Sequence, residues 1–304
     1  MLINLAQRPK RRTTDRPSQR TTITSRQAKR EAIRLLSENR LSAMADYVIE
    51  LLSIGGVLTG HQLRRLAGVT DRTLRRYYRK HFIDRTPFIG DALLDAGFRE
   101  TPLYSLRTYT LGAIGIEIAR LRHERGVSTG YVGYGVQRIL HDVMCNEVVI
   151  RLSAFAAKRG YEALWFSKYE ATVHDERGKP ALEPDSLLVL KKEGNAHRFL
   201  IELHNEDHGG RAANKVNRYE RVYRDGHWRI EWETDEMPIV LVVFRHKAVA
   251  TKGYRKATTD KRGNPRHDLR CVYLGKPWQD ILKGNLEQWW RFNTSELVSI
   301  FEGV

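Results

Sequence analysis

Two acidic residues, Asp185 and Glu202, stand in mostly apolar segments that are predicted to be neighbouring strands. The segments cover residues 183–190 and 199–204, and a polar turn around Gly194 separates them. Apolar runs of this length bounded by turn residues are typical of buried strands. A charge buried in a strand costs several kcal/mol unless it is paired or binds a metal ion. Asp185 and Glu202 are therefore expected to have such a partner.

A third carboxylate, Glu147, interrupts an apolar stripe along the helix that is predicted over residues 131–159. A carboxylate in an apolar helical face indicates a functional site. The alternative is that Glu147 lies at the edge of the stripe and pairs with a neighbouring arginine such as Arg151. The other members of the stripe are Val136, Leu140, Val143, Ile150 and Ala154.

These acidic residues belong to a predicted mixed α/β domain built around a sheet. Its expected order is a long helix, three strands, a helix, two strands and a C-terminal helix. These elements are predicted over residues 131–159, 161–173, 185–192, 197–204, 210–225, 238–245, 270–274 and 277–290. The polar, basic stretch 247–270 is predicted to be a loop.

Upstream, arginines form one face of a helix that is predicted over residues 71–81. Apolar and aromatic residues at the spacing of an amphipathic helix form its opposite face. We predict that the basic face contacts the phosphates or guanines of DNA, with a merely solvated basic helix as the alternative. The basic face consists of Arg72, Arg75, Arg76 and Arg79, and the packing face of Leu74, Tyr77, Tyr78 and His81.

A shorter predicted helix, residues 59–67, precedes the arginine-bearing helix across Gly68. Two helices joined by a tight glycine turn are the helix-turn-helix arrangement, whose second helix enters the major groove of DNA. Alternating residues on both sides of Pro102 predict a β-hairpin wing. The remaining parts of this predicted winged helix-turn-helix domain are helices over 42–55 and 111–125, hairpin strands over 98–101 and 103–110, and a linker over 126–130.

The chain is strongly basic, with a net charge of +16 and a pI of about 9.9. This charge indicates a polyanionic partner, and nucleic acid is the commonest one for a soluble protein. Residues 1–30 contain nine Lys or Arg and a single acid, Asp15. A segment of this composition cannot bury a core, so residues 1–40 are predicted to be a disordered arm that lies along phosphates. A solvated tail without a specific role is the alternative.

The composition favours a soluble, cytoplasmic protein. At 304 residues and 41% hydrophobic content, the chain is long enough for two domains with ordinary cores. It contains no apolar run of about eighteen residues, as a membrane span needs, and its N-terminus lacks the apolar core of a signal peptide. The two cysteines, Cys145 and Cys271, are far apart and fit neither a disulfide framework nor zinc-ligand spacing.

The order of these elements resembles the PD-(D/E)XK nuclease superfamily, which has the restriction-endonuclease-like fold. More narrowly, the winged helix, the Pro-Asp pair at 184–185, the strand end Ile-Glu-Leu at 201–203 and the helix containing 214–219 resemble the replication-relaxation family of plasmid and mobile-element proteins. This resemblance covers roughly residues 45–245. The resulting division of the chain is a basic arm over 1–40, a winged-helix DNA-binding domain over 41–126 and a nuclease-like domain over 127–304.

The resemblance implies hydrolysis of DNA phosphodiesters with Mg²⁺ or Mn²⁺ held by Glu147, Asp185 and Glu202. The superfamily places a lysine two residues after the second acid, and His204 occupies that position here. His204 shares a strand face with Glu202 and is one candidate for the assisting group. Lys215, reaching back from the next helix, is the other.

The combined prediction is a DNA-binding protein of plasmid or mobile-element replication or transfer. It would act on double-stranded DNA as a metal-dependent endonuclease or nickase. Its expected partners are a second copy of the chain or the replication or transfer machinery, and no membrane. The alternative is a non-catalytic, sequence-specific regulator or replication initiator with a degenerate nuclease-like domain.

Overall fold

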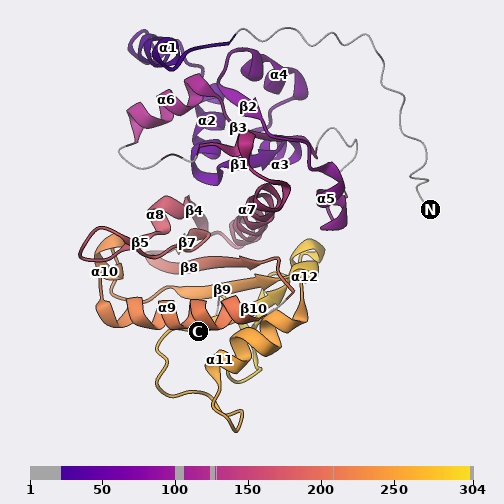
Figure 1. Cartoon of the computed structure of the whole chain (residues 1–304), viewed down its shortest axis with the longest axis vertical. Coiled ribbons are helices and arrows are strands. Elements are labelled where there is room, and N and C mark those ends of the chain that lie inside the picture. The colour runs from indigo at the N-terminus through magenta and orange to yellow at the C-terminus, as the bar shows by residue number, and fades with distance from the viewer. Residues whose placement is uncertain (1–21, 100–105, 124–126, 128, 208, 302–304) are drawn as a thin grey trace, which may run out of the picture.

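The computed structural model describes residues 22–99, 106–123, 127, 129–207 and 209–301. Two parts are stacked along the long axis of the molecule (Figure 1). One part consists of helices around a small sheet, and the other is a large sheet with helices on both faces. Helix α7, Val136–Ala157, lies between the small part and the large sheet.

The N-terminal part carries a three-stranded antiparallel sheet in the order β1-β3-β2. Local signals define its helices: the side chains of Thr59 and Thr70 cap the N-termini of α3 and α4. Gly68 ends α3 in the left-handed conformation, with φ of 64°, that glycine adopts without strain. The elements are α1 Ser25–Ser37, α2 Ala43–Gly55, β1 Val57–Thr59, α3 Gly60–Ala67, α4 Asp71–Arg79, β2 Ile83–Arg85, α5 Gly90–Asp95, β3 Thr108–Leu111 and α6 Ala113–Arg122.

The second part is built on a seven-stranded mixed sheet in the order β12-β11-β10-β9-β8-β7-β4. Strands β8, β9 and β10 are parallel neighbours, and the other pairings are antiparallel. Besides α7, the elements are β4 Glu162–Phe166, α8 Lys168–Ala171, β5 Val173–His174, β6 Pro180–Leu182, β7 Ser186–Lys192, β8 Asn195–His204, α9 Gly210–Asp225, α10 Trp228–Glu231, β9 Ile239–Phe244, a π-helical turn Val249–Arg255, α11 Lys256–Thr258, β10 Tyr273–Pro277, α12 Trp278–Lys283, β11 Gln288–Arg291 and β12 Leu297–Ser299.

The sheet is covered on both faces, by α7 on one and α9 on the other (Figure 1). Alternate residues of β9 enter opposite cores: Leu241 packs on the α7 side, and Val242 packs on the α9 side. A strand buried on both faces needs a continuous apolar run, which explains the sequence Ile239–Phe244. The charged Glu202 therefore stands in the middle of a fully covered sheet.

A buried ion-pair cluster around Glu147 joins the two parts. Its Oε1 accepts hydrogen bonds of 2.6 Å from Arg65 of α3 and 2.6 Å from Arg151 of α7. Its Oε2 accepts from Gln62 Nε2 at 3.1 Å, and that nitrogen also donates to the carbonyl of Val143. The Glu147 side chain is 1% exposed, so its charge is compensated within the protein rather than by solvent.

The mixed α/β class is confirmed, and several predicted elements lie close to their observed bounds. The closest are β7, β8 and α9, whose apolar periodicity is regular and whose ends are marked by turn residues. Across the described ranges, no helix has both the length and the apolar character needed to cross a bilayer.

The prediction of a disordered arm is wrong for residues 25–37. They form α1, which begins with a capping box made by Thr24 and Gln27. The buried faces of Ala28, Ala32 and Leu35 pack in the N-terminal core. Apolar residues at helical spacing therefore determine the structure of this segment despite its basic composition. Residues 1–21 of the predicted arm lie outside the described residues.

The predicted wing is also different. Strand β3 pairs with β1 on one side and with β2, Ile83–Arg85, on the other. Phe98 and Arg99 are not in a strand, and residues 100–105 lie outside the described residues. Within the described part of the predicted strand 103–110, residues 108–110 are extended and belong to β3, which also includes Leu111, the residue predicted to begin the next helix. The short helix α5 between β2 and β3 was not predicted.

Three further predictions are corrected in the C-terminal part. Predicted strand 161–173 breaks after β4 because Ser167 caps the short helix α8. Predicted helix 277–290 stops at Lys283, where Gly284 adopts φ of 82°, and the chain then forms β11. The predicted loop 247–270 contains the π-helical turn and α11.

We predict that Glu147→Gln destabilises the protein by about 3 kcal/mol, because it removes the buried counter-charge of two half-buried arginines, Arg65 and Arg151. The measurement is urea unfolding followed by tryptophan fluorescence. Glu176→Gln, at an exposed glutamate in the β5–β6 turn, is the matched control and is expected to change stability by less than about 0.5 kcal/mol. Equal stability of the two variants would contradict the structural role of Glu147.

Candidate functional site

The candidate site lies where β7 begins and β8 ends, between α7 and α9. In the antiparallel pairing Ser186 faces Ile201, and the backbone N–H of Asp185 donates to the Ile201 carbonyl at 3.1 Å. The Asp185 carboxylate in turn accepts from the backbone N–H of Leu203 at 2.8 Å. The two strands thus bring Asp185 next to Glu202, as predicted.

Lys215 of α9 connects the two carboxylates electrostatically. Its Nζ lies 2.8 Å from Glu202 Oε1 and 3.0 Å from the carbonyl oxygen of Glu183. Burial of Lys215 opposes its charged form, but the charges of Glu202 and Asp185 outweigh that effect and raise the pKa of the amine. Lys215 is therefore a permanent cation at the site, in the position expected for a displaced lysine.

Tyr219, one helical turn after Lys215, donates to the same oxygen of Glu202 at 2.7 Å. Both residues are fixed by α9, because side chains four positions apart lie on one helical face. Glu202 is 1% exposed, and burial raises the pKa of the Tyr219 hydroxyl well above its usual value. The phenol thus remains a hydrogen-bond donor that orients Glu202.

His141 of α7 contacts Asp185 and was not singled out from the sequence. Its Nε2 lies 3.4 Å from Asp185 Oδ2 and 3.1 Å from the Leu203 carbonyl oxygen, and its Nδ1 lies 3.1 Å from Asp142 Oδ1. Burial opposes the charged imidazole, but the charge of Asp185 outweighs it, so the pKa of His141 is raised well above its usual value. Conversely, His141 lowers the pKa of Asp185 far below normal although burial alone would raise it.

Two predicted site residues have other partners. His204 is 4% exposed, with Nδ1 at 2.7 Å from Glu206 and Nε2 at 3.0 Å from the Tyr254 hydroxyl. Burial of Glu206 would raise its pKa, but the bond with His204 lowers it to about 2. Both oxygens of Glu147 are engaged by the cluster with Arg65 and Arg151, so the structure does not join Glu147 to Asp185 and Glu202. The alternative interpretation, in which Glu147 pairs with a neighbouring arginine such as Arg151, agrees with the observed contacts.

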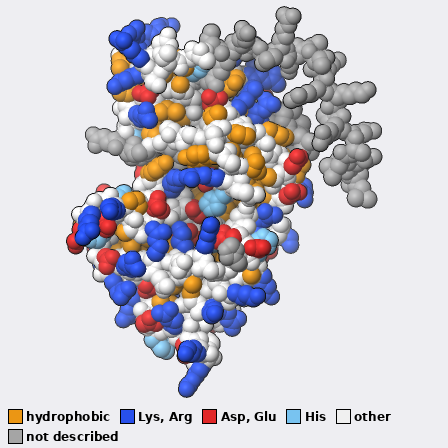
Figure 2. Space-filling model, viewed as in Figure 1, with side chains coloured by type: hydrophobic (Ala, Val, Ile, Leu, Met, Phe, Trp, Pro, Cys, Tyr) orange, Lys and Arg blue, Asp and Glu red, His pale blue; other side chains and the backbone are white. Residues whose placement is uncertain are grey.

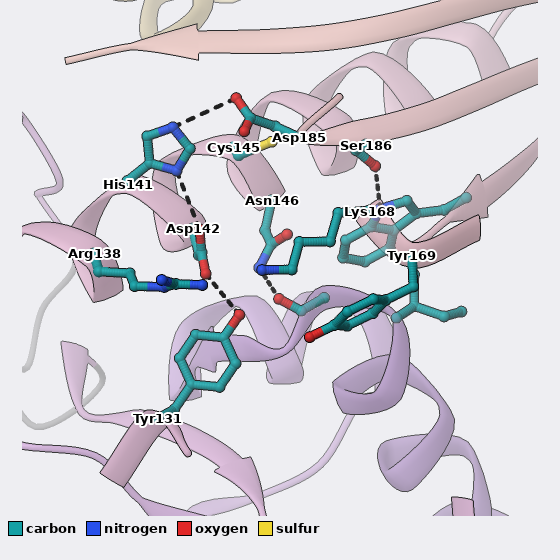
Figure 3. Close-up of a pocket in the computed structure, with 13 residues that line it drawn as sticks. Tyr131, Arg138, His141, Asp142, Cys145, Asn146, Lys168, Tyr169, Asp185 and Ser186 are labelled. Atoms are coloured by element: carbon teal, nitrogen blue, oxygen red, sulfur yellow. Dashed lines mark hydrogen bonds and ion pairs between the residues drawn. The ribbon is translucent and has the colours of Figure 1, made fainter. Parts of the chain in front are cut away.

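A pocket of about 270 Å³ opens beside Asp185 (Figure 3). Its lining includes His141, Asp142, Arg138 and Lys168, so it contains both cationic and acidic side chains. Figure 2 shows Lys and Arg side chains on the visible face where the N-terminal part meets the sheet. Within the described ranges, no group of three or more His, Cys, Asp or Glu side chains is arranged to hold a metal ion.

The four arginines of α4 have the expected disposition. Arg72, Arg75, Arg76 and Arg79 are exposed, and Leu74 and Tyr77 are buried on the opposite face. The helix ends at Arg79, and His81 follows in the left-handed conformation with φ of 57°. Helix α4 therefore presents a basic face to solvent, outside the Asp185 pocket.

We predict that His141→Gln lowers stability by about 2 kcal/mol near pH 5 and by much less near pH 9. Because the pKa of His141 is raised in the folded protein, its stabilising contribution is fully present below about pH 6.5, the pKa of histidine in the unfolded chain. The contribution is lost as the pH rises through the pKa of His141 in the folded protein. The lowered pKa of Asp185 removes the same contribution as the pH falls below about 3.9.

The measurement is denaturant unfolding at several pH values with a chelator present. His174→Gln removes an exposed pair with Glu231 and serves as the control, with an expected effect below about 0.5 kcal/mol at every pH. A loss in His141→Gln that is constant from pH 5 to pH 9 would rule out a charged imidazole.

Comparison with known proteins connects this geometry to a family. A family model described as Replication-relaxation matches residues 49–233, more than half of the chain. No curated protein and no solved structure matches the chain. The matched range includes α4 and all of β7, β8 and α9, which carry the residues described above. It indicates a role in the replication or transfer of a plasmid or mobile element, and the chain belongs to the replication-relaxation family.

Proposed function

We propose that the protein is a cytoplasmic DNA-binding factor of plasmid or mobile-element replication or transfer, and that its second part is a divalent-metal-dependent DNA endonuclease or nickase. The observation that carries the proposal is the ammonium group of Lys215, 2.8 Å from Glu202 and held between the charges of Glu202 and Asp185. A carboxylate pair that can hold a metal ion, next to a fixed cation, suits the metal-assisted hydrolysis of a phosphodiester.

Carboxylate oxygens, which Asp185 and Glu202 would supply, are ligands that suit Mg²⁺ or Mn²⁺. Magnesium is commonly bound by one or two carboxylates together with substrate phosphate and water, rather than by a cage made only of protein. Asp185 and Glu202 would supply the carboxylates. His141 would position Asp185 rather than bind the metal, because its raised pKa favours the protonated imidazole and its Nε2 faces the Leu203 carbonyl oxygen and Asp185. Glu147 is not part of this proposed set, because arginines neutralise it.

The chain's own residues have separable roles in this proposal. A bound metal ion would activate water and neutralise phosphate charge. Lys215 stabilises the negative charge that develops on the phosphate oxygens. Tyr219 and the Leu203 N–H orient Glu202 and Asp185, while Arg138 and Lys168 attract the phosphate backbone to the pocket.

Capture of duplex DNA is assigned to the N-terminal part. The order of two helices, a basic helix and an antiparallel sheet is compatible with a winged helix, in which α4 would enter the major groove. The supporting observation is the exposure of Arg72, Arg75 and Arg79, none of which has a carboxylate partner among the described residues. Phosphate binding by such arginines is electrostatic and depends on salt.

A second candidate function is a regulator or replication initiator whose nuclease-like part does not hydrolyse DNA. The observation that favours it is that the described residues contain no three-ligand metal group. In this case, Lys215 would serve as the permanent counter-ion of Glu202 instead of acting on a phosphate. The following experiment separates the two candidates.

Incubation of supercoiled plasmid with the protein and Mg²⁺ or Mn²⁺ is expected to yield nicked or linear DNA. We predict that Asp185→Asn and Lys215→Met each reduce the cleavage rate at least about 100-fold, because each removes a charge from the proposed site. Asp235→Asn, at an exposed aspartate, is the control and should cleave at the wild-type rate. Metal-independent binding without any cleavage would support the regulator instead.

The role of α4 has its own test. We predict that the combined substitution Arg72→Ala, Arg75→Ala and Arg79→Ala weakens duplex binding and lowers the slope of log K against log salt by about 2 to 3, since each lost phosphate contact contributes about 0.9. Arg177→Ala removes one exposed arginine in the β5–β6 turn and should leave affinity and slope unchanged. An unchanged slope in the triple variant would show that the duplex does not bind to the basic face of α4.

A further inference from the structure

The pocket beside Asp185 is formed where both parts of the protein meet. The end of α2 contributes Ile54 and Gly55, and the opposite wall comes from α7, β4 and α8. Figure 3 shows Tyr169 and His141 on different sides of the pocket, with Asp185 at its margin. A ligand in this space would therefore contact Asp185 on one side and the ring of Tyr169 on the other.

The walls of the pocket are held together by buried hydrogen bonds. Asn146 of α7 donates to the carbonyl oxygens of Gly55 at 2.8 Å and Val57 at 2.7 Å. The backbone of Gly55 lies so close to Trp165 that an added Cβ would come within 2.8 Å of the indole ring. Separating the walls would break these contacts and the Glu147 cluster, so they oppose widening of the pocket.

The size of the pocket suits one nucleotide and not a duplex. Its volume of about 270 Å³ is just below the range of about 300–1,000 Å³ in which proteins hold small organic ligands. Asp185 lines this recess with a side chain that is 23% exposed, so a phosphate that reaches Asp185 from this side must enter the recess. Enzymes with recessed nucleotide pockets act on single strands or on nucleotides extruded from a duplex.

The lining has the chemistry of a single-strand site. The Tyr169 ring is 39% exposed at the pocket, and Lys168 Nζ lies 5.3 Å from its centroid. Arg138, also in the lining, lies 4.4 Å over the ring of Tyr134. Aromatic rings that stack on bases, next to cations that contact phosphates, are the common means of holding unpaired nucleic acid.

We propose that this pocket binds an unpaired nucleotide of single-stranded DNA. The base stacks on Tyr169, and the adjoining phosphates contact Lys168 and Arg138 on the path to Asp185. The inference deepens the proposed function by naming the strand state of its substrate, and it rests on that function only in taking DNA as the ligand. Binding itself requires neither metal nor cleavage.

The test compares a fluorescently labelled single strand of about 20 nucleotides with the duplex of the same sequence, with a chelator present and in about 0.2 M salt to weaken surface phosphate contacts. We expect Tyr169→Ala to weaken single-strand binding about tenfold, which corresponds to the loss of one base stack. Duplex binding should not change. Tyr169→Phe keeps the ring and should bind as the wild type does.

Tyr47→Ala, at an exposed tyrosine of α2 outside the pocket lining, is the matched control and should leave both affinities unchanged. Lys168→Gln provides a second variant and should weaken the single strand more than the duplex. Equal losses for both DNA forms, or no loss in Tyr169→Ala and Lys168→Gln, would overturn the proposal. If cleavage is never observed but Tyr169→Ala still loses single-strand affinity selectively, the pocket assignment stands and the nuclease proposal fails.

Discussion

The buried carboxylate of Glu147 determines how the two parts of the protein are positioned. It accepts hydrogen bonds from Gln62 and Arg65 of α3 and from Arg151 of α7, so one residue joins three side chains across the boundary. A buried charge without its partners is strongly destabilising, which makes the arrangement cooperative. Because α3 precedes the arginine-bearing α4 and α7 carries His141, this cluster also sets the distance between the proposed duplex-binding surface and the carboxylate pair.

The cation of the site lies on a helix instead of a strand, and this has a structural consequence. Lys215 and Tyr219 are four residues apart on α9, so both can donate to a single oxygen of Glu202. The strand position two residues after Glu202 therefore does not need to supply a cation. It is occupied by His204, which packs against Tyr254 with 5.4 Å between the two ring centroids. The cation that a strand lysine would otherwise supply therefore comes from Lys215 of α9, and the corresponding position of β8 is occupied by His204.

The sequence predicted the elements with strong local patterns and missed those that depend on distant contacts. Strand β7, which follows Asp185, strand β8, which carries Glu202, and helix α9, which carries Lys215, were predicted because their apolar periodicity is regular. Strand β2 has three residues, too few for an alternation to be recognised, and is stabilised by pairing with β3. His141 could not be assigned because its contacts with Leu203 and Asp185 join residues far apart in the chain, and nothing around it distinguishes a site histidine from a surface one.

The two proposed DNA contacts differ in accessibility, and this difference constrains how they can operate together. Helix α4 is exposed along its basic face and can follow a groove, whereas the Asp185 pocket is recessed and bounded by fixed walls. The Asn146 hydrogen bonds and the Glu147 cluster across this boundary oppose widening of the pocket. In the proposed function, duplex bound by α4 would therefore reach Asp185 only after local strand separation, which costs a few kcal/mol in unpairing and unstacking. A protein built in this way would favour the boundary between paired and unpaired DNA, because there the separation has already taken place.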